Sequence, residues 1–119
     1  MKVIRTSELE TVVPPDGSEV REIARPPDSA RNQSLAEATI QPGGETAEHY
    51  HRAAEEIYYF VSGAGRMRLG DEESEVGPGE TVVIPPGTRH KLQNTGSEPL
   101  VLLCCSSPPY YDEDTVVTE

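Results

Sequence analysis

Turn-forming residues recur along the whole chain and leave little room for long regular elements. Eleven prolines and ten glycines are spread over 119 residues, and they separate short segments rich in Val, Ile, Leu and Tyr. Proline interrupts helices and central strands, and glycine marks turns, so long helices are disfavoured. Short strands that recur about every eight to twelve residues predict an all-β sandwich or barrel.

The expected strands divide the chain into three parts. Residues 1–32 hold two short strands, at 2–4 and 18–25, in an arm that packs on the barrel or on a partner subunit. The barrel itself is expected over residues 33–107, with strands at 34–40, 46–51, 55–63, 64–70, 71–76, 81–84, 90–94 and 100–106. Residues 108–119 form an acidic tail, and its Tyr110 and Tyr111 are expected to pack back on the body.

The charge and the cysteines narrow the choice of partner and compartment. Acidic residues outnumber basic ones 21 to 10, and the formal net charge of −11 repels nucleic acid and anionic lipid. No apolar run has the length of a signal peptide or a membrane span. Cys104 and Cys105 are adjacent, so on a strand they face opposite ways and a bond between them would be strained. We therefore expect a cytoplasmic protein without a disulfide framework.

One expected strand is apolar on both faces. In EEIYYFVS (55–62), Tyr58 and Phe60 occupy one face, and Ile57 and Tyr59 occupy the other. The wall of a sandwich needs only one apolar face, and a chain of this length cannot cover the second face itself. The pattern predicts a homodimer.

Two histidines separated by one residue indicate a metal site. His49 and His51 lie on one face of an expected strand, with ring nitrogens close enough to share an ion. Glu56 follows a tight reversal, so the adjacent antiparallel strand can carry it to the same volume, although alternation does not separate it from Glu55. His90, the only other histidine, follows a Pro-Pro-Gly turn at the start of another strand. All three histidines thus belong to one expected cluster.

The order and spacing of these residues resemble the two motifs of the cupin superfamily. The first motif reads Gly43, five residues, His49, one residue, His51, four residues, Glu56, six residues, Gly63. The second motif reads Gly79, five residues, Pro85, one residue, Gly87, two residues, His90, three residues, Asn94. The resemblance implies an all-β cupin jelly-roll (double-stranded β-helix) barrel.

The resemblance also implies one divalent metal at the wide mouth of this barrel. The implied ligands are His49, His51, Glu56 and His90, and the spacing of the motif favours Glu56 over Glu55. Imidazoles combined with a carboxylate suit Fe, Mn, Ni, Co, Cu or Zn. Four protein ligands leave coordination positions open, as in catalytic sites and unlike closed structural ones.

Alternation outward from these ligands predicts which residues line the pocket. Tyr58 is the candidate proton donor near the metal, although aromatics more often simply fill a barrel. Arg66 or Arg68 could bind a substrate carboxylate, although solvated charges on an outer face are the commoner arrangement. The other expected pocket residues are Gln41, Phe60, Met67, Leu92 and Asn94.

The family resemblance implies three classes of function. The first is a metal-dependent enzyme (a dioxygenase, a decarboxylase or lyase, or an isomerase or cyclase) acting on a small oxygenated organic substrate. The second is a non-catalytic module that binds a small molecule or sugar, and such modules usually carry a fused DNA-binding domain for which this chain has no room. The third is a metal-free sugar isomerase or epimerase that uses histidine as a base. The complete ligand set favours the first class, because metal-free relatives have little reason to keep all four residues.

Overall fold

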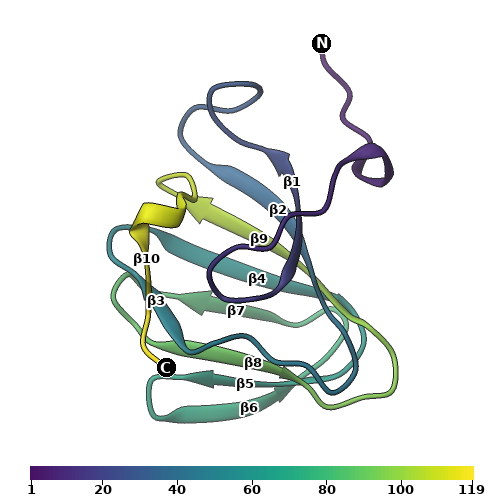
Figure 1. Cartoon of the computed structure of the whole chain (residues 1–119), viewed down its shortest axis with the longest axis vertical. Helices are drawn as coiled ribbons and strands as arrows, with labels where there is room; N and C mark the ends of the chain where they lie inside the picture. The colour runs from purple at the N-terminus through teal and green to yellow at the C-terminus, as the bar shows by residue number, and fades with distance from the viewer.

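Two five-stranded antiparallel sheets face each other in the computed structural model, which describes residues 1–119 (Figure 1). Sheet A has the strand order β1-β2-β9-β4-β7, and sheet B has the order β10-β3-β8-β5-β6. The strands are β1 (Glu19–Ala24), β2 (Ser34–Ile40), β3 (His49–His51), β4 (Glu55–Ser62), β5 (Gly65–Leu69), β6 (Glu72–Val76), β7 (Thr81–Ile84), β8 (His90–Asn94), β9 (Leu100–Ser107) and β10 (Thr115–Val117). The all-β jelly-roll expected from the sequence is confirmed.

Helical structure is limited to two short 3-10 turns. These are η1 (Thr6–Glu8) and η2 (Asp112–Asp114), of three residues each. Neither approaches the length that an apolar helix needs to cross a membrane, and the structure contains no other helix.

The eight strands expected between residues 34 and 106 are all present, but two details near the ends of the chain differ. The strand expected at 2–4 is absent, because this segment pairs with no other strand and Val3 remains exposed. The tail instead supplies β10, which pairs with β3 so that Thr115 lies opposite His51. A short apolar stretch near the end of the tail, Val116 and Val117, thus completes the edge of sheet B.

Inward-facing residues change from apolar at one end of the barrel to polar at the other. Along β4 they run from Phe60 through Tyr58 to Glu56, and along β9 they run from Leu100 to Ser106. The apolar end forms a single core, in which each large buried side chain contributes about 1.5–3 kcal/mol. Its members are Ala38, Ile40, Tyr58, Phe60, Met67, Val76, Ile84, Leu92, Leu100 and Leu102. The fold therefore leaves the polar end free to form a site.

Gly63 closes the apolar end of the barrel, between β4 and β5. Its φ of 90° lies in the left-handed region. A Cβ at this position would come within 2.6 Å of the Pro99 carbonyl oxygen and 2.8 Å of the Leu100 Cα. Only glycine combines this φ with so close a backbone approach.

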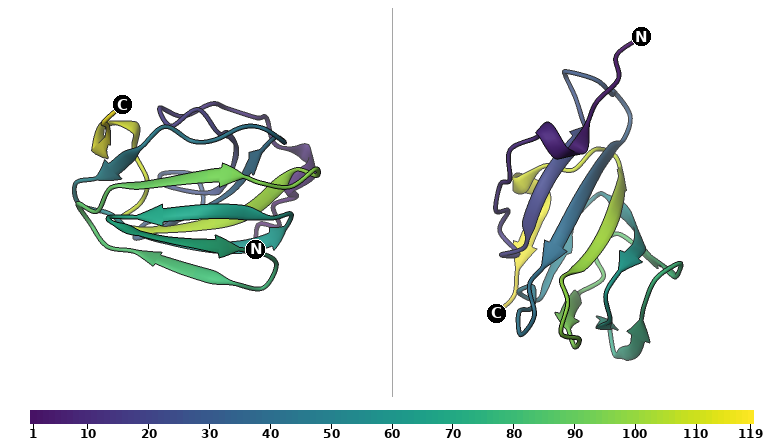
Figure 2. Two further views of the ribbon diagram at one scale, coloured as in Figure 1. Left: turned by 90° about the horizontal axis from the view of Figure 1, so that it is seen from below. Right: turned by 90° about the vertical axis from the view of Figure 1, so that its right-hand side faces the viewer.

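The outer faces of the two sheets differ in chemistry (Figure 2 shows the sheets as layers). Sheet A exposes apolar side chains from β4 and β7, with Tyr59 46% and Val83 51% exposed. Sheet B is covered by charged side chains from β5 that form ion pairs. Arg66 pairs with Glu73 at 2.9 Å, and Arg68 pairs with Glu48 at 2.6 Å. Both arginines therefore lie outside the barrel, as the outer-face interpretation of their spacing expected.

Candidate metal centre

Three histidines meet at the polar end of the barrel. His49 and His51 come from β3, and His90 begins β8, where it pairs directly with His49. Their ring nitrogens lie within 4.8 Å of one another, and each side chain is at most 3% exposed. Two spaced positions on one strand and a register pair on the next therefore bring all three rings to one point.

Glu56 approaches the same point from sheet A. Its Oε1 lies 2.7 Å from Nε2 of His51 and 3.7 Å from Nε2 of His90. Despite these contacts, the three atoms are buried and none has a hydrogen-bond partner with good geometry. Glu55, the alternative carboxylate, is exposed on the outer face of β4. The alternation of β4 thus points one glutamate inward and the other into solvent.

Unpaired buried polar atoms cost about 1–3 kcal/mol each, so three of them around one point require an explanation. A divalent cation would satisfy both imidazole nitrogens and the carboxylate oxygen at once. The residues present therefore fit a metal ion bound by His49, His51, His90 and Glu56.

Each imidazole is held through the nitrogen that faces away from this point. Nδ1 of His49 donates to the Ala47 carbonyl at 2.7 Å, and Nδ1 of His90 donates to the Thr88 carbonyl at 2.9 Å. A carbonyl only accepts, so these bonds place the proton on Nδ1 and leave Nε2 with a lone pair. Nδ1 of His51 contacts Oγ1 of Thr115 at 3.1 Å.

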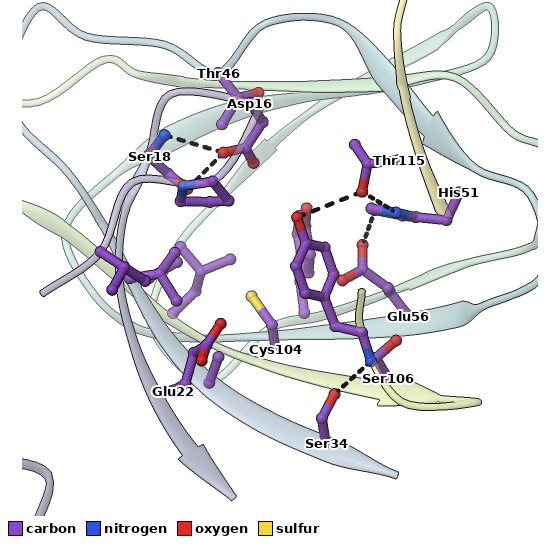
Figure 3. A pocket seen from close by; sticks show the side chains of 18 of the residues that line it. Asp16, Ser18, Glu22, Ser34, Thr46, His51, Glu56, Cys104, Ser106 and Thr115 are labelled. Carbon is purple, nitrogen blue, oxygen red and sulfur yellow. Dashed lines mark hydrogen bonds and ion pairs between the residues drawn. The ribbon is translucent and has the colours of Figure 1, made fainter. Parts of the chain in front are cut away.

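A cavity of about 240 Å³ opens beside the histidines (Figure 3). Its walls come from the inner face of sheet A, including Ala38 of β2, Tyr58 of β4 and Leu102 of β9. Two segments near the ends of the chain complete the lining, Val12–Ser18 on one side and Tyr110–Thr115 on the other. Molecules that enter this cavity can reach the candidate metal ligands.

Comparison with known proteins places this fold and site in a family. Residues 36–106 match the family model for the cupin domain. The chain belongs to the cupin family. The matched residues include all four candidate ligands of this cupin, whereas the N-terminal segment and the tail that line its cavity lie outside the match.

The matches to individual relatives span very different shares of the relatives' own lengths. The cupin is 45% identical to an uncharacterized protein of Methanocaldococcus jannaschii, over 100% of this chain and 98% of that protein. It is 32% identical to the mannose-1-phosphate guanylyltransferase RfbM of Salmonella typhimurium, over 76% of this chain but 19% of the enzyme. The crystal structure of Lactobacillus farciminis oxalate decarboxylase in a formate complex superposes with a TM-score of 0.79 at 29% identity. That match covers 93% of this chain and 34% of the decarboxylase, so the cupin corresponds to about a third of that enzyme.

Burial and neighbouring charges shift the pKa values of the site residues in different directions. Burial, together with the adjacent His49, lowers the pKa of His90 to about 4. Burial also depresses the pKa of His51, but the Glu56 carboxylate outweighs it and the net shift is upward. Burial raises the pKa of Tyr58 well above its usual value. His90 is therefore neutral at physiological pH, as a metal ligand must be, and Tyr58 keeps its proton.

Four of the residues expected in the pocket face the inside of the barrel, but they lie at different distances from the candidate metal ligands. Tyr58 and Leu92 line the cavity, and the Tyr58 ring lies 6.0 Å from the His90 ring. Phe60 and Met67 face inward but lie in the apolar core and do not line the cavity. Alternation gives the face of a strand on which a residue lies, and it does not give the distance along the barrel axis.

Two other expected pocket residues have structural contacts instead. Asn94 is buried, and its amide donates to the carbonyls of Ile40 at 2.9 Å and Glu98 at 2.8 Å. Gln41 is exposed beyond the end of β2, where its amide donates to Glu19 at 3.4 Å. Both side chains lie away from the cavity, because Asn94 is bonded to backbone carbonyls inside the barrel and Gln41 lies in solvent after β2 has ended.

Sequence reasoning missed several polar residues of the cavity. Asp16 and Ser18 belong to the N-terminal segment, and Thr115 belongs to the tail. Their local sequences, PPDGS and DEDTVVT, are typical of turns and acidic tails. The run of three β-branched residues in the tail, TVV (115–117), was the one signal that could have indicated an extra strand.

Proposed function

We propose that this cupin is a metal-dependent enzyme that acts on a small oxygenated organic substrate. The observation that carries the proposal is the set of unpaired buried atoms, Nε2 of His51, Nε2 of His90 and Oε1 of Glu56, beside an accessible cavity. Without metal, Nε2 of His51 and Oε1 of Glu56 could pair only with each other across 2.7 Å, and Nε2 of His90 would stay buried and unpaired. This counts against the metal-free isomerase or epimerase.

The proposed ligands are His49, His51, Glu56 and His90, and the proposed metal is one of Fe, Mn, Ni, Co, Cu or Zn. When bound, such a metal polarises an oxygen of the substrate and lowers the pKa of bound water. The reaction classes that suit this chemistry are those of a dioxygenase, a decarboxylase or lyase, and an isomerase or cyclase. The similarity to an oxalate decarboxylase supports the lyase class among them.

Tyr58 is proposed as the proton donor of the reaction. It lines the cavity close to the His90 ring, and its raised pKa keeps the phenol protonated until a substrate atom nearby becomes basic. Its neighbours on the inner face of β4 are the Glu56 carboxylate on one side and the apolar core on the other. This position between the metal ligands and the core fixes the ring and directs it into the cavity.

The assembly we propose is a homodimer formed through the outer face of sheet A. Ile57, Tyr59, Val61 and Val83 are 37–51% exposed there, whereas sheet B carries ion pairs on its outer face. A second copy of the chain would cover this apolar face.

The two free cysteines, Cys104 and Cys105, fit a reducing compartment, and the cytoplasm is the location that we propose.

Metal analysis tests the proposed function. We expect protein purified without an affinity tag to contain about one divalent metal per chain, and His49→Ala and His90→Ala to lose it while their circular dichroism spectra remain those of a folded β protein. Full metal occupancy in both variants would exclude the assignment. The metal-loaded protein would then be screened for oxygen uptake and for carbon dioxide release with small acids and diketones. Retention of an organic ligand without turnover would instead support a binding module.

A further inference from the structure

The N-terminal segment holds a carboxylate in a fixed orientation beside the candidate metal ligands. Oδ1 of Asp16 accepts hydrogen bonds from the Ser18 amide at 3.0 Å and the Ser18 hydroxyl at 2.7 Å (Figure 3). The Asp16 carbonyl accepts from the Ala47 amide at 2.8 Å, which ties the segment to the residues just before β3. Oδ2 lies 3.7 Å from Nε2 of His49 and has no hydrogen bond of its own. This oxygen is available to a molecule in the cavity.

The cavity lining has an excess of negative charge. Its carboxylates are Asp16, Glu22, Glu56 and Asp112. Arg25 is the one arginine or lysine in the lining, and Glu22 neutralises it in an ion pair at 2.5 Å near the rim. No unpaired lysine or arginine is left to bind a carboxylate or a phosphate.

The charges closest to the proposed metal are already balanced. A divalent cation carries two positive charges, and the Glu56 and Asp16 carboxylates together carry two negative charges. Asp16 is only 14% exposed, so water screens its charge weakly. An anionic molecule at the metal would add uncompensated negative charge beside Asp16, whereas a hydroxyl group would donate a hydrogen bond to Oδ2.

We propose that Asp16 makes this site select uncharged, hydroxyl-bearing small molecules over carboxylates and phosphates. The inference deepens the proposed function and rests on it, since the metal ligands form the floor of the same cavity. The apolar part of the lining, including Val20, Leu92 and Leu102, would contact the carbon skeleton of such a molecule. The similarity to an oxalate decarboxylase then does not extend to a carboxylate substrate, and of the reaction classes proposed above the inference favours those other than decarboxylation.

A pair of probes of nearly equal shape tests this selection. Glycolamide and glycolate both present a hydroxyl beside a carbonyl-type oxygen, and they differ by one negative charge. Each is titrated into protein loaded with Co²⁺, and the visible absorption of the cobalt ion reports its coordination. The variants are Asp16→Asn, Ser18→Ala, and Glu98→Gln as a control for lost charge, because Glu98 is exposed in the β8–β9 turn outside the cavity.

We expect Asp16→Asn to bind glycolate about tenfold more tightly, because it removes a like charge a few ångströms away, and to bind glycolamide several-fold more weakly. Ser18→Ala, which loosens Asp16 without removing it, should shift both probes in the same directions by less. Glu98→Gln should leave both affinities within about twofold of wild type.

Three results would overturn the inference about Asp16. They differ in whether the proposed metal site and the proposed function would also have to be abandoned. If Asp16→Asn moves both probes in the same direction or neither, Asp16 does not select by charge, and the metal site still stands. If the cobalt spectrum of Asp16→Asn without a probe differs from that of the wild type, Asp16 is a metal ligand and not a selector. If the wild-type protein binds no Co²⁺, the proposed function fails and the inference fails with it.

Discussion

Thr115 contacts the candidate metal ligand His51 from the C-terminal tail, with 3.1 Å between its Oγ1 and Nδ1 of the ring. The pairing of β10 with β3 fixes this contact, because it places Thr115 directly opposite His51. Asp114 strengthens the attachment by accepting hydrogen bonds from the amides of Ala53 and Ala54 at 2.9 and 3.1 Å. The tail therefore supports the ring from the side opposite the proposed metal.

Replacing Thr115 tests whether this support matters for metal binding. We predict that Thr115→Val lowers metal affinity about 10–100-fold, because loss of the partner of a ligating histidine frees its ring to rotate. Thr115→Ser keeps the hydroxyl and should retain most of the affinity. Competition with a chromophoric chelator measures both. Equal weakening in the two variants would mean that Thr115 acts through packing of β10 and not through its hydroxyl.

The neighbouring glutamates of β4 provide a matched pair. We predict that Glu56→Gln reduces metal affinity at least tenfold, since it removes the negative charge beside His51 and His90. Glu55→Gln should leave the affinity unchanged, because Glu55 is exposed on the outer face. Isothermal titration calorimetry with Co²⁺ or Zn²⁺ provides the measurement. Similar losses in both variants would contradict the assignment of Glu56.

Glycine substitutions separate two kinds of backbone strain. Gly63→Ala should lower the free energy of unfolding by about 2 kcal/mol or more, because a Cβ would collide with the backbone of Pro99 and Leu100. Gly43 also has a positive φ, of 80°, but a Cβ there would meet nothing within 4 Å. Gly43→Ala should therefore cost only about 1 kcal/mol. Urea unfolding compares the two, and equal stability would show that the barrel relaxes around Gly63.

The outer face of sheet A can be tested through the oligomeric state. Multi-angle light scattering at tens of micromolar protein should give the mass of a dimer for the wild type and of a monomer for Val83→Arg, which places a charge on the most exposed of these apolar side chains, beside Ile57. Gln93→Arg alters the outer face of sheet B and should leave the dimer intact. A monomeric wild-type protein would contradict the dimer directly.

Much of the barrel could be predicted because its signals are local. Turn residues delimit the strands from 34 to 106, and spacing within short segments brings His49 and His51 to one face. Alternation alone could not choose between Glu55 and Glu56, because two adjacent glutamates do not reveal the register of β4, and only the spacing of the motif favoured Glu56. In the structure Glu56 lies opposite Ile84 on β7 and both are buried, whereas Glu55 is exposed.

The contributions of the chain ends could not be predicted, because they depend on contacts between distant segments. Asp16 reaches the site through a backbone bond to Ala47, and Thr115 reaches it through a strand that forms only against β3. Neither local sequence contains information about its partner. The same reason explains the absent strand at 2–4, where an apolar segment found no neighbour to pair with.

The cavity of this cupin combines residues of two origins, since the candidate metal ligands lie within the matched domain and other lining residues, among them Asp16 and Thr115, lie outside it. Two relatives could therefore keep the same metal ligands and the same barrel and still differ in the residues that line the cavity and contact the substrate. Substrates assigned to new cupins by barrel similarity alone would then be wrong most often where the termini diverge. Comparing the sequences that flank the domain is the more informative way to group these proteins by reaction.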